Sequence, residues 1–192
     1  MAASLGIVIR EYDDRWPAEF EEVARLLRAG LGGLALRVDH IGSTSVPGLA
    51  ATDVIDVQVS VADLHDSRLL RALEELGATD TGLRTDHVPA GAGREFSAWE
   101  KRYVRPPAWR PTHVHVREVG RANTRYALLF RDYLRHSPAA AAAYAEVKLA
   151  LARLHPDDVE AYYAVKDPAC DLVMDAAERW AQQTGWSQDP ER

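Results

Sequence analysis

Small and hydroxyl-bearing residues gather in HIGSTSVPGL, residues 40–49, directly after an apolar run. Gly42 lets the backbone approach a ligand closely. Ser43, Thr44 and Ser45 add hydroxyl groups beside their backbone N–H groups, a combination that can surround phosphate oxygens. We therefore predict a phosphate-binding loop here. The same residue types are common in ordinary turns, so this stretch alone leaves both interpretations open.

The run that follows, DVIDVQVSV (53–61), alternates as a strand does, so that Asp56 and Gln58 share a face opposite the valines. Mg²⁺ prefers one or two carboxylates together with phosphate oxygens and water. Asp56, with the carbonyl oxygen of Gln58, is accordingly predicted to bind Mg²⁺ or Mn²⁺ and to take part in catalysis. The alternative is that Asp56 faces solvent or caps a neighbouring backbone group.

A later run, THVHV (112–116), places His113 and His115 on one face of another predicted strand. Two imidazoles side by side can bind a transition metal, hold a phosphate when charged, or transfer protons. We predict a catalytic role for both, with a structural pair as the alternative. Because no third histidine or cysteine cluster lies nearby in the sequence, a dedicated zinc site is not expected.

Basic residues are concentrated in residues 94–135, which contain ten Lys or Arg and four Asp or Glu, whereas the whole chain carries a formal charge of −6. The acidic total argues against binding to long nucleic acids, and the local excess suits a small anion better. Solvated surface arginines are the alternative. Arg131 is predicted to contact the phosphate. Arg135 and Lys148 could reach it too, or all three could pair with acidic neighbours such as Asp132.

These side chains need a scaffold, and the hydrophobic periodicity predicts a mixed sheet flanked by helices. Alternation predicts strands over residues 6–12, 34–42, 54–61, 94–105 and 112–119. Amphipathic spacing predicts helices over residues 15–32 and 66–78, and helical structure from residue 123 onward. There, Ser137-Pro138 and Asp167-Pro168 each join an N-cap residue to a proline that suits the first helical turn, so a helix is predicted to begin at each.

The length of 192 residues, of which 47% are hydrophobic, fits one globular domain spanning residues 1–192. We expect an α/β fold with a small mixed sheet of about four to six strands and a helical C-terminal part. The longest apolar stretch, after Pro138, is too short to span a bilayer, and the N-terminus does not read as a signal peptide. With Cys170 as its one cysteine, the protein is expected to be cytoplasmic, with no membrane partner.

Four runs, in this order, resemble the GrpB family: HIGSTSVPGLAATDVIDVQV, THVHV, LLFRDYLRHSP and YAEVKLAL. The resemblance covers residues 7–181 and implies the nucleotidyltransferase fold. It also implies a bacterial setting, because GrpB domains occur fused to dephospho-CoA kinase in some actinobacteria.

The wider nucleotidyltransferase superfamily has a hydrophobic-Gly-Ser start and a later strand with an Asp-hydrophobic-Asp or Glu motif. The run Ile-Gly-Ser at 41–43 is similar to that start, and Asp56 is similar to the first acid. Gln58 stands where the second carboxylate belongs. His113 and His115 lie on the later strand, where active relatives carry a third carboxylate for two Mg²⁺ ions. The resemblance therefore implies the fold more strongly than the two-metal reaction.

We predict a nucleotidyltransferase-like protein that binds a nucleotide or another phosphorylated small molecule, with metal-assisted nucleotidyl or phosphoryl transfer as its fullest activity. The alternative is a non-catalytic ligand-binding or accessory module linked to coenzyme A synthesis. The chain lacks a Gly-x-x-x-x-Gly-Lys-Ser/Thr run and is therefore not expected to be the kinase itself.

Overall fold

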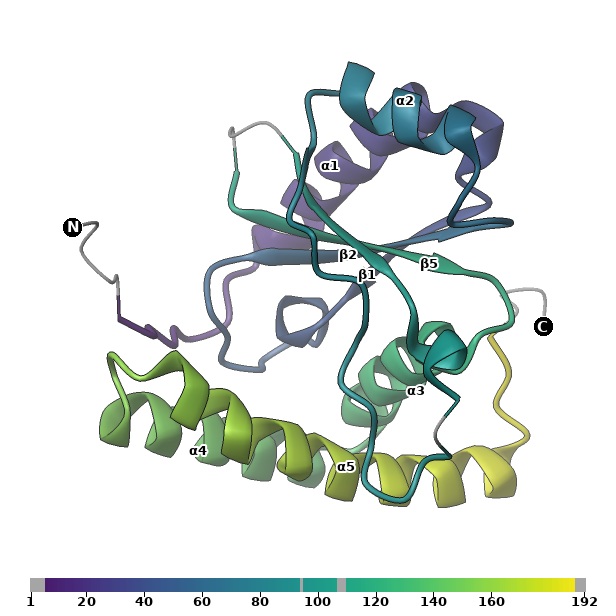
Figure 1. Ribbon diagram of the computed structural model, residues 1–192. Helices are drawn as coiled ribbons and strands as arrows, with labels where there is room; N and C mark the ends of the chain where they lie inside the picture. The colour runs from purple at the N-terminus through teal and green to yellow at the C-terminus, as the bar shows by residue number, and fades with distance from the viewer. Residues whose placement is uncertain (1–5, 94, 107–109, 189–192) are drawn as a thin grey trace.

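The computed structural model of the protein describes residues 6–93, 95–106 and 110–188 (Figure 1). The strands are β1 (Arg37–Ile41), β2 (Ile55–Val61), β3 (Thr79–Asp80), β4 (Arg102–Arg105) and β5 (Thr112–Glu118). They form one mixed sheet in the order β1-β2-β5-β4-β3, with β2 and β5 parallel and the other neighbours antiparallel. The helices are α1 (Trp16–Leu31), α2 (Ser67–Glu75), α3 (Ala122–His136), α4 (Pro138–Leu154) and α5 (Val159–Thr184). The predicted α/β class with a small mixed sheet is confirmed.

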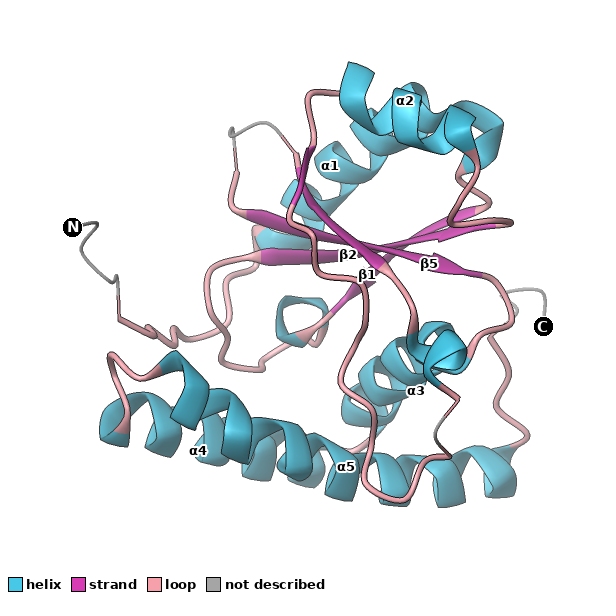
Figure 2. Ribbon diagram, viewed as in Figure 1, coloured by secondary structure: helices cyan, strands magenta, loops and turns pink. Residues whose placement is uncertain are grey.

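The sheet lies between two layers of helices (Figure 2). On one side α1 and α2 cover the apolar face, because their buried residues pack against the inward valines of β2 and β5 in one core. On the other side lie α3, α4 and α5 (Figure 1). Val46 and Leu49, which follow the predicted phosphate loop, pack there against Leu134, Tyr144 and Cys170 of the three helices. The polar side chains of the central strands therefore face the C-terminal helices.

Three predicted elements differ from the structure. Residues 6–12 form no regular strand. The segment makes a single β-bridge, between Arg10 and Ala51, because it runs beside the loop between β1 and β2 and not beside an edge strand of the sheet. A helix does not begin at Asp167-Pro168, since α5 runs through Pro168. The N-cap is Asp158, whose side chain accepts a hydrogen bond from the Ala161 amide at 2.9 Å. Proline inside a helix removes one backbone hydrogen bond, which the packing of α5 against α3 and α4 tolerates.

The segment preceding β4 also differs from the expected strand over residues 94–105. Phe96–Trp99 forms a short 3₁₀ helix, and the strand itself begins at Arg102. Among the described residues, no helix combines the length and the apolar character needed to cross a membrane.

Candidate functional site

The parallel pairing of β2 and β5 brings the predicted catalytic residues together. Asp56 is the register partner of His113, and Gln58 is the partner of His115. Asp56 Oδ1 lies 3.3 Å from His113 Nδ1 and 3.7 Å from His115 Nε2. A carboxylate and two imidazoles separated by more than fifty residues in the sequence thus form one cluster, which can orient and exchange protons.

The ionisation of this cluster follows from its neighbours. Burial alone would raise the pKa of Asp56, but the contacts with His113 and His115 outweigh it and hold the pKa below its usual range. Burial lowers the pKa of His115 to about 4, and Arg117 and Lys101 act in the same direction. Lys101 Nζ lies 3.2 Å from His115 Nδ1. Because an ammonium group has donors only, Nδ1 accepts, and the imidazole proton belongs on Nε2, facing Asp56.

A network of charged side chains lies next to His115 on β5 and contacts it through Lys101. Asp86 accepts hydrogen bonds from Lys101 at 2.6 Å, from Arg117 at 2.8 Å and from Asn123 at 3.0 Å. Arg117 also donates to Gln58 Oε1 at 2.6 Å. The Gln58 oxygen that the sequence suggested as a metal ligand is therefore already a hydrogen-bond acceptor within the protein interior.

Gly42 positions the predicted phosphate loop directly against Asp56. Its φ of 69° with ψ of −173° lies in a region that side-chain-bearing residues rarely adopt. A Cβ at this position would come within 2.4 Å of Asp56 Oδ2. After Gly42, residues Ser43–Ser45 form a 3₁₀ turn in which Ser45 Oγ donates to the Gly42 carbonyl at 2.6 Å. Gly42 is thus the residue that permits close contact between the loop and the carboxylate.

Thr44 and the arginines of α3 hold this loop in place. Thr44 Oγ1 lies 3.0 Å from Nε2 of the buried His40. Arg131 donates to the His40 carbonyl at 3.1 Å, and Arg135 donates to the Ser45 carbonyl at 2.7 Å. In this arrangement the Arg131 guanidinium positions the loop, and its predicted contact with phosphate stays a prediction.

Most arginines of the basic segment are paired with carboxylates. Contacts of this kind are made by Arg102, Arg110, Arg117, Arg121, Arg125, Arg131 and Arg135. Among the described residues of the segment 94–135, the positive charge is therefore largely neutralised by acidic residues, many of them from outside the segment.

Lys148 differs from these arginines. It is 2% exposed and makes no ion pair with a carboxylate in the part of the chain that the structure describes. Its Nζ donates to Ser43 Oγ at 2.7 Å and to the Ala50 carbonyl at 2.5 Å. Burial, with Lys166 nearby, lowers the pKa of Lys148 to about 7. Lys148 therefore brings a basic group without a carboxylate partner directly against the predicted phosphate loop.

The residues at this site do not fit a pair of hard divalent cations. Asp56 supplies one carboxylate, and the Gln58 oxygen is already bonded to Arg117. Arg117 and Lys101 are buried cations next to Gln58 and His115, and their positive charge disfavours a nearby metal ion. Within residues 6–93, 95–106 and 110–188, no group of three or more His, Cys, Asp or Glu side chains is arranged to hold a metal. Binding of Mg²⁺ or Mn²⁺ stays a prediction.

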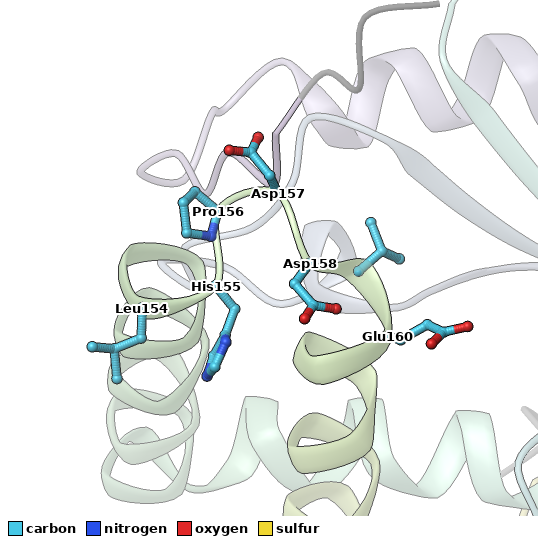
Figure 3. Close-up of a pocket in the computed structure, with 7 residues that line it drawn as sticks. Leu154, His155, Pro156, Asp157, Asp158 and Glu160 are labelled. Carbon is cyan, nitrogen blue, oxygen red and sulfur yellow. The ribbon is translucent and has the colours of Figure 1, made fainter.

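Two hollows elsewhere on the surface do not include the predicted site residues. One, of about 590 Å³, lies at the turn between α4 and α5 and is lined by residues 154–160 (Figure 3). Its carboxylates Asp157, Asp158 and Glu160 would repel a phosphate. The other, of about 440 Å³, lies beyond the carboxyl ends of β2 and β5, with Ser60 and Trp186 in its lining.

The sequence pointed to four of the segments that form the site but missed part of the chemistry. Lys148 was one of three basic side chains with two open roles, and its separation from acidic partners is visible in the tertiary structure alone. Asp86 lies in a predicted loop and Lys101 in a predicted strand, and no sequence motif marks either residue.

Comparison with known proteins gives consistent matches along the chain. The family described as GrpB protein matches residues 6–176. The UPF0157 protein BH1888 of Halalkalibacterium halodurans is 36% identical over 173 residues, covering 90% of this chain and 83% of that protein. A dephospho-CoA kinase of Mycolicibacterium paratuberculosis is 35% identical over 193 residues, covering 91% of this chain and 46% of that protein. The chain thus spans about half the length of this relative.

A solved structure agrees with these sequence matches. The crystal structure of conserved protein GrpB from Enterococcus faecalis superimposes with a TM-score of 0.73 and 34% sequence identity. The match covers 90% of this chain and 99% of that one. The likeness therefore extends over most of the chain and is not confined to a local motif.

Proposed function

The chain belongs to the GrpB family, and from this premise we propose that it binds a small phosphorylated molecule, such as a nucleotide, beside Ser43 and Lys148. In this proposal the phosphate lies at the loop of residues 42–45 and meets its free amides and the Ser43 hydroxyl, whereas the hydroxyls of Thr44 and Ser45 keep the loop in shape through their bonds to His40 and Gly42. Asp56, His113 and His115 lie on the adjoining strands and orient the bound molecule or exchange a proton with it.

Lys148 carries the proposal. Most other buried or half-buried cations near the sheet contact a carboxylate, whereas Lys148 contacts a serine hydroxyl and a backbone carbonyl in the described part of the chain. An uncompensated ammonium group inside a protein is costly, and an anion that binds beside it recovers much of that cost. Lys166, close enough to lower the pKa of Lys148, adds a second positive charge on the same side.

The arrangement of the histidines supports proton transfer at this place. His113 has a side chain that is 34% exposed, so it can reach a bound molecule. His115 is held neutral by burial and faces Asp56, so it acts as a fixed donor. Transfer of a nucleotidyl or phosphoryl group is the fuller form of the proposal. Such a transfer needs positive charge to neutralise the phosphate oxygens, and the single carboxylate of Asp56 is too little to hold the two metal ions that supply this charge in two-metal sites.

Calorimetry tests the proposal with a panel of inorganic phosphate, nucleotides, sugar phosphates, dephospho-CoA and coenzyme A, each with and without Mg²⁺ or Mn²⁺. A binder present at 100 times its Kd should stabilise the fold by about 2.7 kcal/mol. Lys148→Met should weaken binding at least about tenfold, since a charge-assisted hydrogen bond contributes roughly 1.5–3 kcal/mol. Arg179→Met, which removes an exposed cation of α5, is the matched control. A panel without saturable binding, or binding that ignores Lys148→Met, would reject the proposal.

A second candidate is an accessory module of coenzyme A synthesis. One observation favours it: relatives that carry this chain's match in about half their length are named dephospho-CoA kinase. Selective, metal-independent binding of dephospho-CoA or coenzyme A that survives Asp56→Asn would support the module. Binding that requires a divalent cation and is lost in Asp56→Asn would support the enzyme instead.

A further inference from the structure

We propose that Ser43 and Lys148 form a nucleophile and base pair, in which Ser43 Oγ attacks an electrophilic phosphorus centre and Lys148 Nζ takes its proton. This activity goes beyond ligand binding. It rests on the proposed function in one respect, the choice of a phosphorus electrophile in place of another electrophile.

The geometry suits a serine activated by an amine. Ser43 Oγ and Lys148 Nζ are 2.7 Å apart, within the distance that a nucleophile and its base need. Ser43 is partly exposed, whereas Lys148 is 2% exposed. The hydroxyl can therefore meet a reactant from solvent while the amine stays behind it, out of water. Serine with lysine as its base is an established variant of the serine nucleophile.

The surroundings of Lys148 also suit its neutral form. A neutral amine can accept the Ser43 hydroxyl proton with its lone pair and donate one N–H to the Ala50 carbonyl at 2.5 Å. Its other N–H can point to the Tyr144 ring, whose centroid lies 4.8 Å from Nζ. All valences of the nitrogen are then used without a carboxylate. An ammonium group is accommodated by the same three neighbours, so the surroundings of Nζ accept both protonation states.

The charged groups around Lys148 determine how much neutral amine is present. Burial lowers its pKa to about 7, and Lys166 on α5 acts in the same direction. Cys170 on α5 and Asp56 on β2 act in the opposite direction. Both protonation states are consequently available near neutral pH, which is where a general base is most effective.

The proposed substrate is a phosphate ester or anhydride, written R–O–P. The Ser43 Oγ–P bond forms and the P–OR bond breaks, while the proton moves from Oγ to Nζ and then to the leaving oxygen, which departs as R–OH. Water next attacks phosphorus, the Oγ–P bond breaks, and the water proton returns through Nζ to Ser43. The serine and the amine are regenerated, and no oxidant or reductant is needed.

Labelling with diisopropyl fluorophosphate tests the pair directly. The Oγ–P bond forms, the P–F bond breaks, fluoride leaves, and the proton passes to Lys148. Intact-mass and peptide analysis should find one phosphoryl adduct, on Ser43. The adduct should disappear in Ser43→Ala and persist in Ser187→Ala, which removes an exposed serine. Absence of an adduct on Ser43 would overturn the proposal.

Two variants at Lys148 separate the base from the charge. Lys148→Met should slow labelling by about 10²–10⁴-fold, the range that a general base contributes. Lys148→Arg should slow it as strongly while preserving binding of inorganic phosphate, because arginine keeps its charge and does not act as a base. Thermal melts verify that both variants fold. Labelling at an unchanged rate in both would show that the hydrogen bond only ties α4 to the loop.

The two proposals fail in different ways. Phosphate binding without labelling of Ser43 would reject the nucleophile and leave the binding site. Labelling of Ser43 without saturable binding of any phosphorylated compound would reject the proposed ligand class and leave the nucleophile.

Discussion

At the scale of single residues, two separate features make Gly42 suited to its place between the loop and the cluster of Asp56, His113 and His115. Its positive φ is a conformation that favours glycine, and the space where a Cβ would lie is filled by the Asp56 carboxylate. Gly48, in the same stretch, shares the positive φ but has open space where a Cβ would lie. A comparison of substitutions at the two positions can therefore separate the effect of backbone strain from the effect of steric contact.

We expect Gly42→Ala to destabilise the protein more than Gly48→Ala does. Gly48→Ala should cost about 1–2 kcal/mol, the penalty for a left-handed conformation. Gly42→Ala adds a clash that must displace Asp56 from His113 and His115, so phosphate-ligand binding should fall as well. Urea unfolding of both variants measures the difference. Equal losses of stability, with ligand binding intact, would contradict this account of Gly42.

At the scale of the elements, the loop between β3 and β4 holds separate parts of the sheet layer together. Asp86 of this loop bonds to Lys101 just before β4, to Arg117 on β5 and to Asn123 on α3. Burial would raise the pKa of Asp86, but Arg117 and Lys101 outweigh it and hold the pKa below its usual range. One carboxylate therefore compensates two buried cations, and the same network positions His115 through Lys101.

Asp86→Asn should cost about 3–5 kcal/mol, because it leaves buried cations without their counter-charge. Chemical denaturation measures the loss. Asp175→Asn is the control, since Asp175 forms an exposed pair with Arg179 and should change stability by no more than about 0.5 kcal/mol. A small effect of Asp86→Asn, similar to the control, would mean that Lys101 and Arg117 find other partners.

At the scale of the whole molecule, each face of the sheet carries a neutral histidine, of which His40 is buried and His115 is half-buried. His40 stacks on Phe20 of α1 with the ring centroids 4.6 Å apart, and His115 lies on the opposite face of the sheet, on the side of α3. Burial lowers the pKa of each to about 4. The unfolded chain protonates these two histidines more readily than the folded protein does, so acidification favours unfolding.

The organisation of residues 1–192 as a single domain stays a prediction.

The free energy of unfolding should therefore decrease as the pH falls from about 6.5, where unfolded histidine titrates, toward about 4. Each histidine contributes roughly 3 kcal/mol over the full window. Above pH 7 both states are neutral and this contribution is fully present. Urea unfolding at pH 7.5 and pH 4.5 measures the change, and His40→Gln should reduce it by close to half. An unfolding free energy that stays constant across this window would contradict the assignment.

The sequence by itself determined the elements whose patterns are local. Alternating valines predicted β2 and β5, amphipathic spacing predicted α1 and α2, and the glycine and hydroxyl residues after β1 predicted the loop. These features are readable because a period of two or 3.6 residues reports which face is buried. The pairing of Asp56 with His113 then required the parallel register, which no local pattern contains.

The tertiary structure decided which polar groups are free and which are already bonded. Gln58 accepts from Arg117, Arg131 supports the loop, and Lys148 meets Ser43 across 105 residues. Helix α5 continues through the exposed Pro168 because other residues of α5 pack against α3 and α4, although the local signal at Asp167-Pro168 predicts a helix start. The physical reason is the same in each case: a side chain's partner and pKa depend on burial and on groups brought close by folding, and residue type fixes only what chemistry is possible.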